Sequence, residues 1–159
     1  MKSDNMKSEQ IKNDALQRTD KVIMLVEDDP DDIFIFQRAL QAAHISLPLV
    51  ILTNGQEALD YLSHSGKYAD QAQYPLPFVV FLDLKLPYID GFEILTWIRK
   101  QPSLESVVVV ALSGSDETRD HQKSYTLGAR SYVVKPPTAV QLRQFMESMA
   151  SYGDWPKNI

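Results

Sequence analysis

The chain has 159 residues, of which 44% are hydrophobic, and these totals fit one globular domain. A net charge of −5 and the lack of any Lys/Arg cluster argue against direct binding to nucleic acid. Cysteine is absent, which excludes thiolate chemistry, and no apolar stretch has the length of a membrane span or the pattern of a signal peptide, so we expect a cytoplasmic protein without membrane insertion.

Composition divides the chain into three parts. Residues 1–20 are mostly polar, which predicts a flexible N-terminal tail. Apolar patterning typical of a folded domain extends over 21–150. The remaining residues, 151–159, form a C-terminal tail. Its Tyr152 and Trp155 either pack back on the domain, which is the more common case, or contact a partner.

Five short apolar runs in the domain predict five β-strands. Each run is apolar at both alternating sets of positions, as expected of a strand that is covered on both faces. The runs lie at 22–26, 49–52, 78–82, 107–112 and 132–134.

Four clear helical patterns and one weak one follow these runs. Asp29 and Asn54 are expected to cap the first two helices. The weak pattern, at 115–128, offers only two large apolar side chains before Gly128, so we expect it to be the loosest helix. The four clear helices are predicted after Pro30, at 54–62, at 91–100 and from Thr138 onward.

Alternating strands and helices predict an α/β fold. Parallel neighbours need crossover connections, so we expect a doubly wound five-stranded parallel sheet with helices on both faces. The connection at 63–77 is long for such a fold, and we regard it as a candidate contact for a partner.

Polar side chains follow four of the five predicted strands. Glu27 and Asp28 come after the first, Asp83 after the third, Ser113 after the fourth and Lys135 after the fifth. In open α/β sheets ligands bind beyond the carboxyl ends of the strands, so these side chains are expected to converge on one edge. Each residue alone could be a cap, a turn residue or a solvated lysine, but four coincidences together argue for a shared site.

The acidic residues at this edge predict a bound cation. Carboxylates at neighbouring strand ends repel one another when they are partly removed from water. Oxygen ligands without His or Cys favour a hard divalent ion, and Mg²⁺ suits a few carboxylates better than Ca²⁺ does. Asp29, Asp31 and Asp32 have a different expected role at the start of the first helix, where each first-turn acid is favoured by about 0.3–1 kcal/mol.

Taken together, these residues resemble a bacterial response-regulator receiver domain over about 21–150. The motif consists, in order and spacing, of Glu27, Asp28, Asp83, Ser113, Tyr132 and Lys135 before Pro136. The segment DLKLPYIDGFEIL and the long connection before the third strand most resemble single-domain regulators paired with cyanobacterial and bacterial phytochrome kinases. The resemblance implies a flavodoxin-like receiver fold with strand order 2-1-3-4-5.

The resemblance also implies a site chemistry. Asp83 would accept a phosphoryl group from a phosphohistidine. The donor would be a sensor histidine kinase, for example a bacteriophytochrome, or a phosphotransfer protein. Mg²⁺ would be held by Asp28, Asp83, the carbonyl of Lys85 and water contacts from Glu27. Lys135 would add a second positive charge.

The resemblance further implies that the signal passes through a conformational switch. The Ser113 hydroxyl would turn to the phosphate, Tyr132 would turn into the space this opens, and the fourth helix, fifth strand and fifth helix would change their surface. With no output domain expected after residue 159, the phosphorylated form would bind another protein or form a homodimer. The protein would be a signalling protein that catalyses only its own phosphorylation and dephosphorylation, not an enzyme.

Lys85 departs from the neutral residue that many relatives carry at this position. It could pair with Glu27 or shield the acyl phosphate, and our hypothesis is that it slows dephosphorylation. Two alternatives stay open: an aspartyl-phosphate phosphatase or phosphotransferase, which typically needs a second acid where Lys85 stands, and a phosphorylation-independent interaction module. The three histidines, including His121, lack metal spacing and are expected at the surface.

Overall fold

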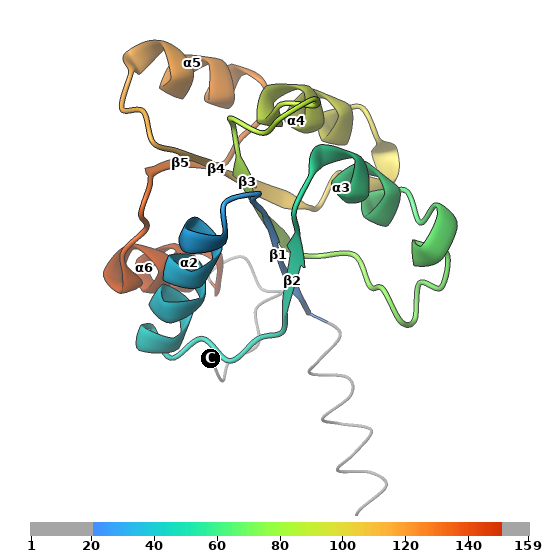
Figure 1. The fold of residues 1–159 in the computed structure, drawn as a ribbon, viewed down its shortest axis with the longest axis horizontal. Coiled ribbons are helices and arrows are strands. Elements are labelled where there is room, and N and C mark those ends of the chain that lie inside the picture. The colour runs from blue at the N-terminus through green and yellow to red at the C-terminus, as the bar shows by residue number, and fades with distance from the viewer. Residues whose placement is uncertain (1–20, 151–159) are drawn as a thin grey trace, which may run out of the picture.

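The structure is a computed structural model that describes residues 21–150 (Figure 1). The tails predicted at 1–20 and 151–159 lie outside the described residues. Five parallel strands form one sheet in the order β2-β1-β3-β4-β5, which confirms the predicted doubly wound fold. The strands are β1 (Ile23–Val26), β2 (Leu49–Leu52), β3 (Val79–Asp83), β4 (Val108–Ser113) and β5 (Ser131–Val134).

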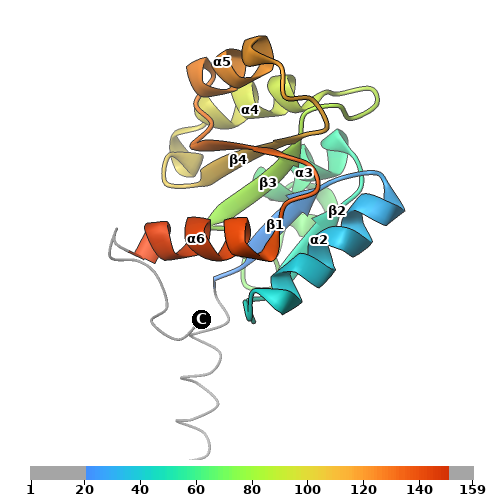
Figure 2. The ribbon, with the colours of Figure 1, turned by 90° about the vertical axis from the view of Figure 1, so that its left-hand side faces the viewer.

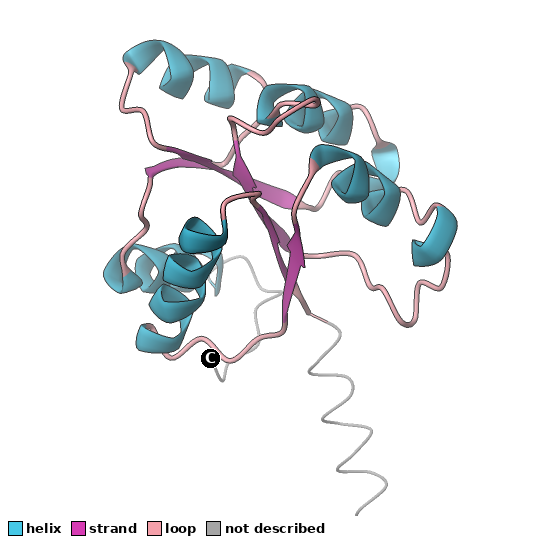
Figure 3. Ribbon diagram, in the orientation of Figure 1, coloured by secondary structure: helices cyan, strands magenta, loops and turns pink. Residues whose placement is uncertain are grey.

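Helices cover both faces of the sheet, as Figures 1 and 2 show. The helices α2 and α6 pack together on one face, and α3, α4 and α5 lie on the other. Figure 3 shows the sheet between these two layers. The α-helices are α2 (Pro30–Ala42), α3 (Gly55–Leu62), α4 (Gly91–Arg99), α5 (Thr118–Thr126) and α6 (Ala139–Ala150), and the short 3-10 helices are η1 (Gly66–Tyr68) and η2 (Pro102–Leu104).

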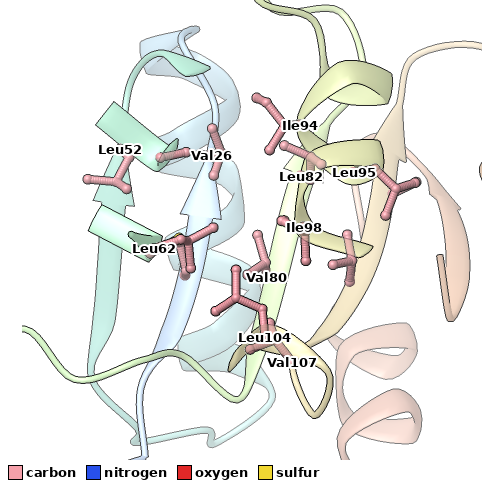
Figure 4. Packing of buried hydrophobic residues seen from close by; sticks show 14 of the residues in the cluster. Val26, Leu52, Leu62, Val80, Leu82, Ile94, Leu95, Ile98, Leu104 and Val107 are labelled. Atoms are coloured by element: carbon pink, nitrogen blue, oxygen red, sulfur yellow. The ribbon is translucent and has the colours of Figure 1, made fainter. Parts of the chain in front are cut away.

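Alternate side chains of the central strands pack into two apolar cores. On one face Leu82 packs in a cluster with Ile94 and Ile98 of α4 (Figure 4). On the other face the Phe81 ring contacts Phe36 of α2 edge-on, with 5.0 Å between the ring centroids. Each fully buried side chain of this size contributes about 1.5–3 kcal/mol, so the two cores hold the central strands and their ends in fixed positions.

Helix ends form where the sequence predicts them. Asp29 accepts hydrogen bonds from two backbone N–H groups of α2, at 2.8 and 3.2 Å, and Asn54 accepts one at 2.9 Å. Thr138 and Gln141 form a reciprocal capping box, with each side chain accepting from the other residue's N–H at 3.1 and 2.9 Å. Gly128, just after α5, adopts a φ of +105°, which favours glycine.

The prediction that every strand is covered on both faces is wrong for the two edge strands. All residues of β1 and β3 are buried, whereas three of the four residues of β2 are only half-buried. In β5 Tyr132 is the single buried residue. An edge strand has a neighbour on one side only, and the helix layers end near it, so apolar composition alone overestimates its burial.

The long connection at 63–77 is anchored by aromatic contacts. Tyr61, Tyr68 and Tyr74 pack mutually with ring centroids 5.0–5.8 Å apart. The Tyr61 hydroxyl donates to the carbonyl of Pro75 at 2.8 Å. A role for this connection in contacting a partner stays a prediction.

None of the helices between residues 21 and 150 combines the length and apolar character that crossing a bilayer requires.

Candidate functional site

The carboxyl ends of four neighbouring strands meet at one edge of the sheet. Asp83 is the last residue of β3 and Ser113 the last of β4, while Glu27 and Asp28 follow β1 and Lys135 follows β5. The strands are parallel with matched registers, so these five residues come to the same edge.

Three carboxylates form a compact cluster there. One ligand oxygen from each of Glu27, Asp28 and Asp83 lies within 4.8 Å of the others. Glu27 and Asp83 are buried, with exposed fractions of 1% and 3%, whereas Asp28 is exposed. One open side next to two buried carboxylates is an arrangement that fits a hard divalent cation with some of its waters retained.

The electrostatics of Glu27 support this fit. Burial, followed by the negative charge of Asp83, raises the pKa of Glu27 to about 7. The N–H of Asp29, which donates to Glu27 Oε1 at 3.2 Å, and the Lys135 ammonium oppose this shift without cancelling it. The ionised form of Glu27 is therefore disfavoured at this edge, and a divalent cation would stabilise it.

Lys135 provides the positive charge of the site. Its Nζ lies 2.9 Å from Asp32 Oδ2, 3.1 Å from Glu27 Oε2 and 3.4 Å from Asp83 Oδ2. Burial alone would lower the pKa of Lys135, but the hydrogen bond to Asp32 and the charges of Asp83 and Glu27 raise it above its usual value. Lys135 is thus a permanently charged neighbour of the buried Asp83 carboxylate.

Ser113 and Tyr132 are both tied to the loop before α5. The Ser113 hydroxyl oxygen accepts a hydrogen bond from the N–H of Ser115 at 3.1 Å. The Tyr132 side chain is buried, and its hydroxyl donates to the carbonyl of Ser115 at 2.5 Å. Ser115 therefore links the edge of the sheet to the tyrosine, and the Tyr132 ring already lies inward in this structure.

Comparison with known families places this geometry in context. A family model described as the response regulator receiver domain matches residues 23–147. The chain belongs to this family. Among relatives of this receiver domain, Response regulator Rcp1 of Synechocystis sp. is 34% identical over 132 residues, which cover 83% of this chain and 88% of Rcp1. Probable methanogenesis regulatory protein FilR2 of Methanothrix harundinacea is 33% identical over 141 residues, covering 87% and 88% of the two chains.

Solved structures of similar proteins share the fold of this receiver domain. The bacteriophytochrome response regulator AtBRR is 35% identical with a TM-score of 0.74, covering 86% of this chain and 97% of AtBRR. The phosphorylated cyanobacterial phytochrome response regulator RcpA is 36% identical with a TM-score of 0.69, covering 83% and 92%. The Mn(2+)-bound form of Rcp1 is 34% identical with a TM-score of 0.67, covering 83% and 93%. These relatives confirm the predicted resemblance to phytochrome-associated regulators.

Asp32 belongs to the site of this receiver domain, although the sequence predicted only a first-turn charge on the helix. That prediction was incomplete, since Asp32 is the nearest of the three carboxylates to the Lys135 ammonium. A signal was present in the sequence. Asp32 lies one helical turn before Phe36 and two before Leu40, both of which are buried, so the sheet-facing stripe of α2 extends back to it.

Lys85 and Gly91 shape the surroundings of Asp83. The Lys85 N–H donates to Asp83 Oδ1 at 3.1 Å, while the Lys85 side chain is exposed. The suggested pairing of Lys85 with Glu27 is not found between residues 21 and 150, where Lys135 is the ammonium partner of Glu27. At Gly91 a Cβ would overlap the carbonyl oxygen of Asp83, so glycine is required for α4 to begin this close to β3.

His121, which the sequence predicted to lie at the surface, is half-buried and makes specific contacts that the sequence did not predict. Its ring packs on that of Tyr132, with 3.8 Å between centroids and an interplanar angle of 30°. Its Nε2 lies 2.9 Å from Asp116 Oδ1. The contact joins α5 to β5, and no local pattern in the weak helix predicts it, because it depends on how two distant segments pack.

Proposed function

We propose that Asp83 of this response regulator accepts a phosphoryl group from the phosphohistidine of a sensor histidine kinase, and that the change is read at the surface formed by α5, β5 and α6. The single observation that carries the proposal is the position of Asp83. Its buried carboxylate lies within 4.8 Å of ligand oxygens of Glu27 and Asp28 and 3.4 Å from the Lys135 ammonium. The acceptor thus has both candidate cation ligands and a positive charge beside it.

The transfer step follows from the chemistry of the carboxylate. An Asp83 oxygen attacks the phosphorus, forming an O–P bond while the N–P bond of the donor histidine breaks. The electron pair of the broken bond stays on the imidazole nitrogen, which can then take a proton from solvent. Lys135 offsets charge on the transferred oxygens. Mg²⁺, held by Asp28, Asp83 and the carbonyl of Lys85 with a water contact from Glu27, would neutralise further charge at the same oxygens.

The signal would pass through the loop before α5. If the Ser113 hydroxyl turns to a phosphoryl oxygen, its bond from the Ser115 N–H is lost. Ser115 also holds the Tyr132 hydroxyl, and Tyr132 packs on His121 of α5. A change at Asp83 would thereby shift the balance between arrangements of α5 and β5. The readout would be binding of another protein or formation of a homodimer.

A kinase of the bacteriophytochrome type is the partner that the relatives favour. RcpA and AtBRR are named as phytochrome and bacteriophytochrome response regulators, and both are at least 35% identical to this chain. A phosphotransfer protein carrying a phosphohistidine would present the same chemistry to Asp83.

The two rival functions fit less well. A phosphatase or phosphotransferase of the aspartyl-phosphate type needs an acid two residues after the nucleophile, and that position is Lys85. A module that acts without phosphorylation would not need Asp83, Ser113 and Lys135 at one edge of the sheet.

The proposal is tested by incubating the protein with a small phosphodonor and Mg²⁺ and measuring its intact mass. Wild type should gain one phosphoryl group and Asp83→Asn none. Removal of Mg²⁺ with a chelator should abolish the gain. An unmodified wild type, or an Asp83→Asn variant modified to the same extent, would contradict the proposed function.

A further inference from the structure

Asp32 and Lys135 form the shortest of three ion pairs made by the same ammonium. The Asp32 carboxylate comes from the first turn of α2 and lies 2.9 Å from Lys135 Nζ, compared with 3.1 Å for Glu27 and 3.4 Å for Asp83. The Lys135 side chain is 17% exposed and that of Asp32 is 33% exposed, so the pair is partly withdrawn from water.

These contacts engage two of the three N–H donors of Lys135, with Asp32 and Glu27 as the hydrogen-bond acceptors. An ammonium group has three N–H donors, and here three carboxylates lie within ion-pair distance of it. A phosphoryl group on Asp83 would bring additional anionic oxygens that also need a donor. Asp32 and Glu27 would then compete with these oxygens for the N–H donors of Lys135.

Asp32 is the partner whose role differs from the others. Glu27 and Asp83 are part of the carboxylate cluster suited to a divalent cation, whereas Asp32 is outside that cluster. Its contact joins the Lys135 ammonium to the first turn of α2.

We propose that Asp32 is a positioning residue that competes with the phosphoryl group for Lys135 and thereby weakens the retention of that group on Asp83. The proposal rests on the proposed function and adds a means by which this chain limits the stability of its phosphorylated form. Loss of the Asp32 charge would free one N–H donor of Lys135 for the phosphoryl oxygens.

Asp31 provides a matched control for total charge. It is the neighbouring residue in the same turn of α2 and is exposed, and no ion pair is found for it within residues 21–150. Asp31→Asn and Asp32→Asn therefore change net charge and helix-end charge equally. Only Asp32→Asn removes a charge that contacts Lys135.

The experiment titrates the full chain with beryllium chloride in excess fluoride and Mg²⁺, because beryllium fluoride bound to an aspartate mimics an acyl phosphate. Apparent dissociation constants are measured by isothermal titration calorimetry for wild type, Asp32→Asn, Asp32→Glu and Asp31→Asn. An exposed or partly buried ion pair is worth up to about 1 kcal/mol, so Asp32→Asn should bind about two- to fivefold more tightly than wild type. Asp31→Asn and Asp32→Glu should bind as wild type does.

A second pair of variants tests whether Asp32 acts through Lys135. In a Lys135→Gln background the Asp32→Asn substitution should no longer tighten binding, which is the result a double-mutant cycle gives for two coupled groups. The proposal is overturned if Asp32→Asn binds no more tightly than wild type, if Asp31→Asn or Asp32→Glu gives the same gain, or if the gain persists without Lys135. Failure of wild type to bind beryllium fluoride at all would instead contradict the proposed function.

Discussion

Lys135 Nζ lies 3.4 Å from Asp83 Oδ2, although Asp83 ends β3 and Lys135 follows β5, and β4 separates these two strands in the sheet. The contact exists because parallel strands end at one edge and both side chains are turned into it. Charge stabilisation for an incoming phosphoryl group is therefore built into the folded chain, and the donor does not have to organise it.

Removing the Lys135 ammonium should lower the free energy of unfolding, and a bound divalent cation should restore part of that loss. Lys135→Gln leaves the buried Glu27 and Asp83 carboxylates without their ammonium partner, and an unpaired buried group costs about 1–3 kcal/mol. We expect urea unfolding to show that loss without metal and a smaller loss with saturating Mg²⁺. Equal losses with and without Mg²⁺ would show that the ion does not occupy the carboxylate cluster.

Affinity for Mg²⁺ should rise with pH through about 7, because burial and the Asp83 charge raise the pKa of Glu27 to that value. Between the ordinary value of 4.5 and about 7, the folded protein holds this proton more tightly than the unfolded chain does. Metal-free stability should therefore decrease as pH rises through this window. Calorimetric Mg²⁺ titrations on either side of pH 7 check the affinity, and Glu27→Gln should show a flatter pH profile than wild type.

Gly91→Ala should displace the backbone of Asp83, although Gly91 is eight positions later in the sequence. A methyl group at this position meets the backbone of Asp83, which cannot move without shifting β3, so we expect a loss of about 1–3 kcal/mol in unfolding free energy together with slower phosphorylation. Gly114→Ala is the control, since nothing lies within 4 Å of a Cβ there. Comparable stability of the two variants would mean that the close approach of α4 is not required.

Lys85→Asn should lose phosphate faster than wild type if the exposed Lys85 side chain shields an acyl phosphate on Asp83. The time course of phosphate loss after donor removal measures this directly. Lys100→Asn, at the far end of α4, removes a charge away from the site and should decay at the wild-type rate. Equal rates of phosphate loss for wild type and Lys85→Asn would contradict the hypothesis that Lys85 slows dephosphorylation.

Much of the site was predictable because it depends on topology. Apolar runs located the strands, and a parallel sheet places all their carboxyl ends together, so Asp83 and Lys135 could be assigned to one edge without any coordinates. Helix ends such as those at Asp29 and Asn54 were predictable too, because capping is a contact between residues close in the chain.

Contacts between side chains of distant segments were harder to predict. The Asp32 carboxylate has a satisfactory local role at the start of α2, which concealed its pairing with Lys135. The contact of His121 with Tyr132 depends on how α5 lies against β5, and that packing has no short-range signature. Both contacts were missed because each residue also makes a tertiary contact that its sequence neighbours do not indicate.

The most direct test of the account is to locate the phosphoryl group on the chain. After phosphorylation with a small donor and Mg²⁺, borohydride reduces an acyl phosphate to an alcohol and releases phosphate, which marks the modified residue for peptide mass spectrometry. We predict that the reduced residue is at position 83 and that Asp83→Asn yields no reduced peptide. Reduction at Asp28, Glu27 or another acid, with Asp83 unchanged, would contradict the assignment of Asp83 as the acceptor.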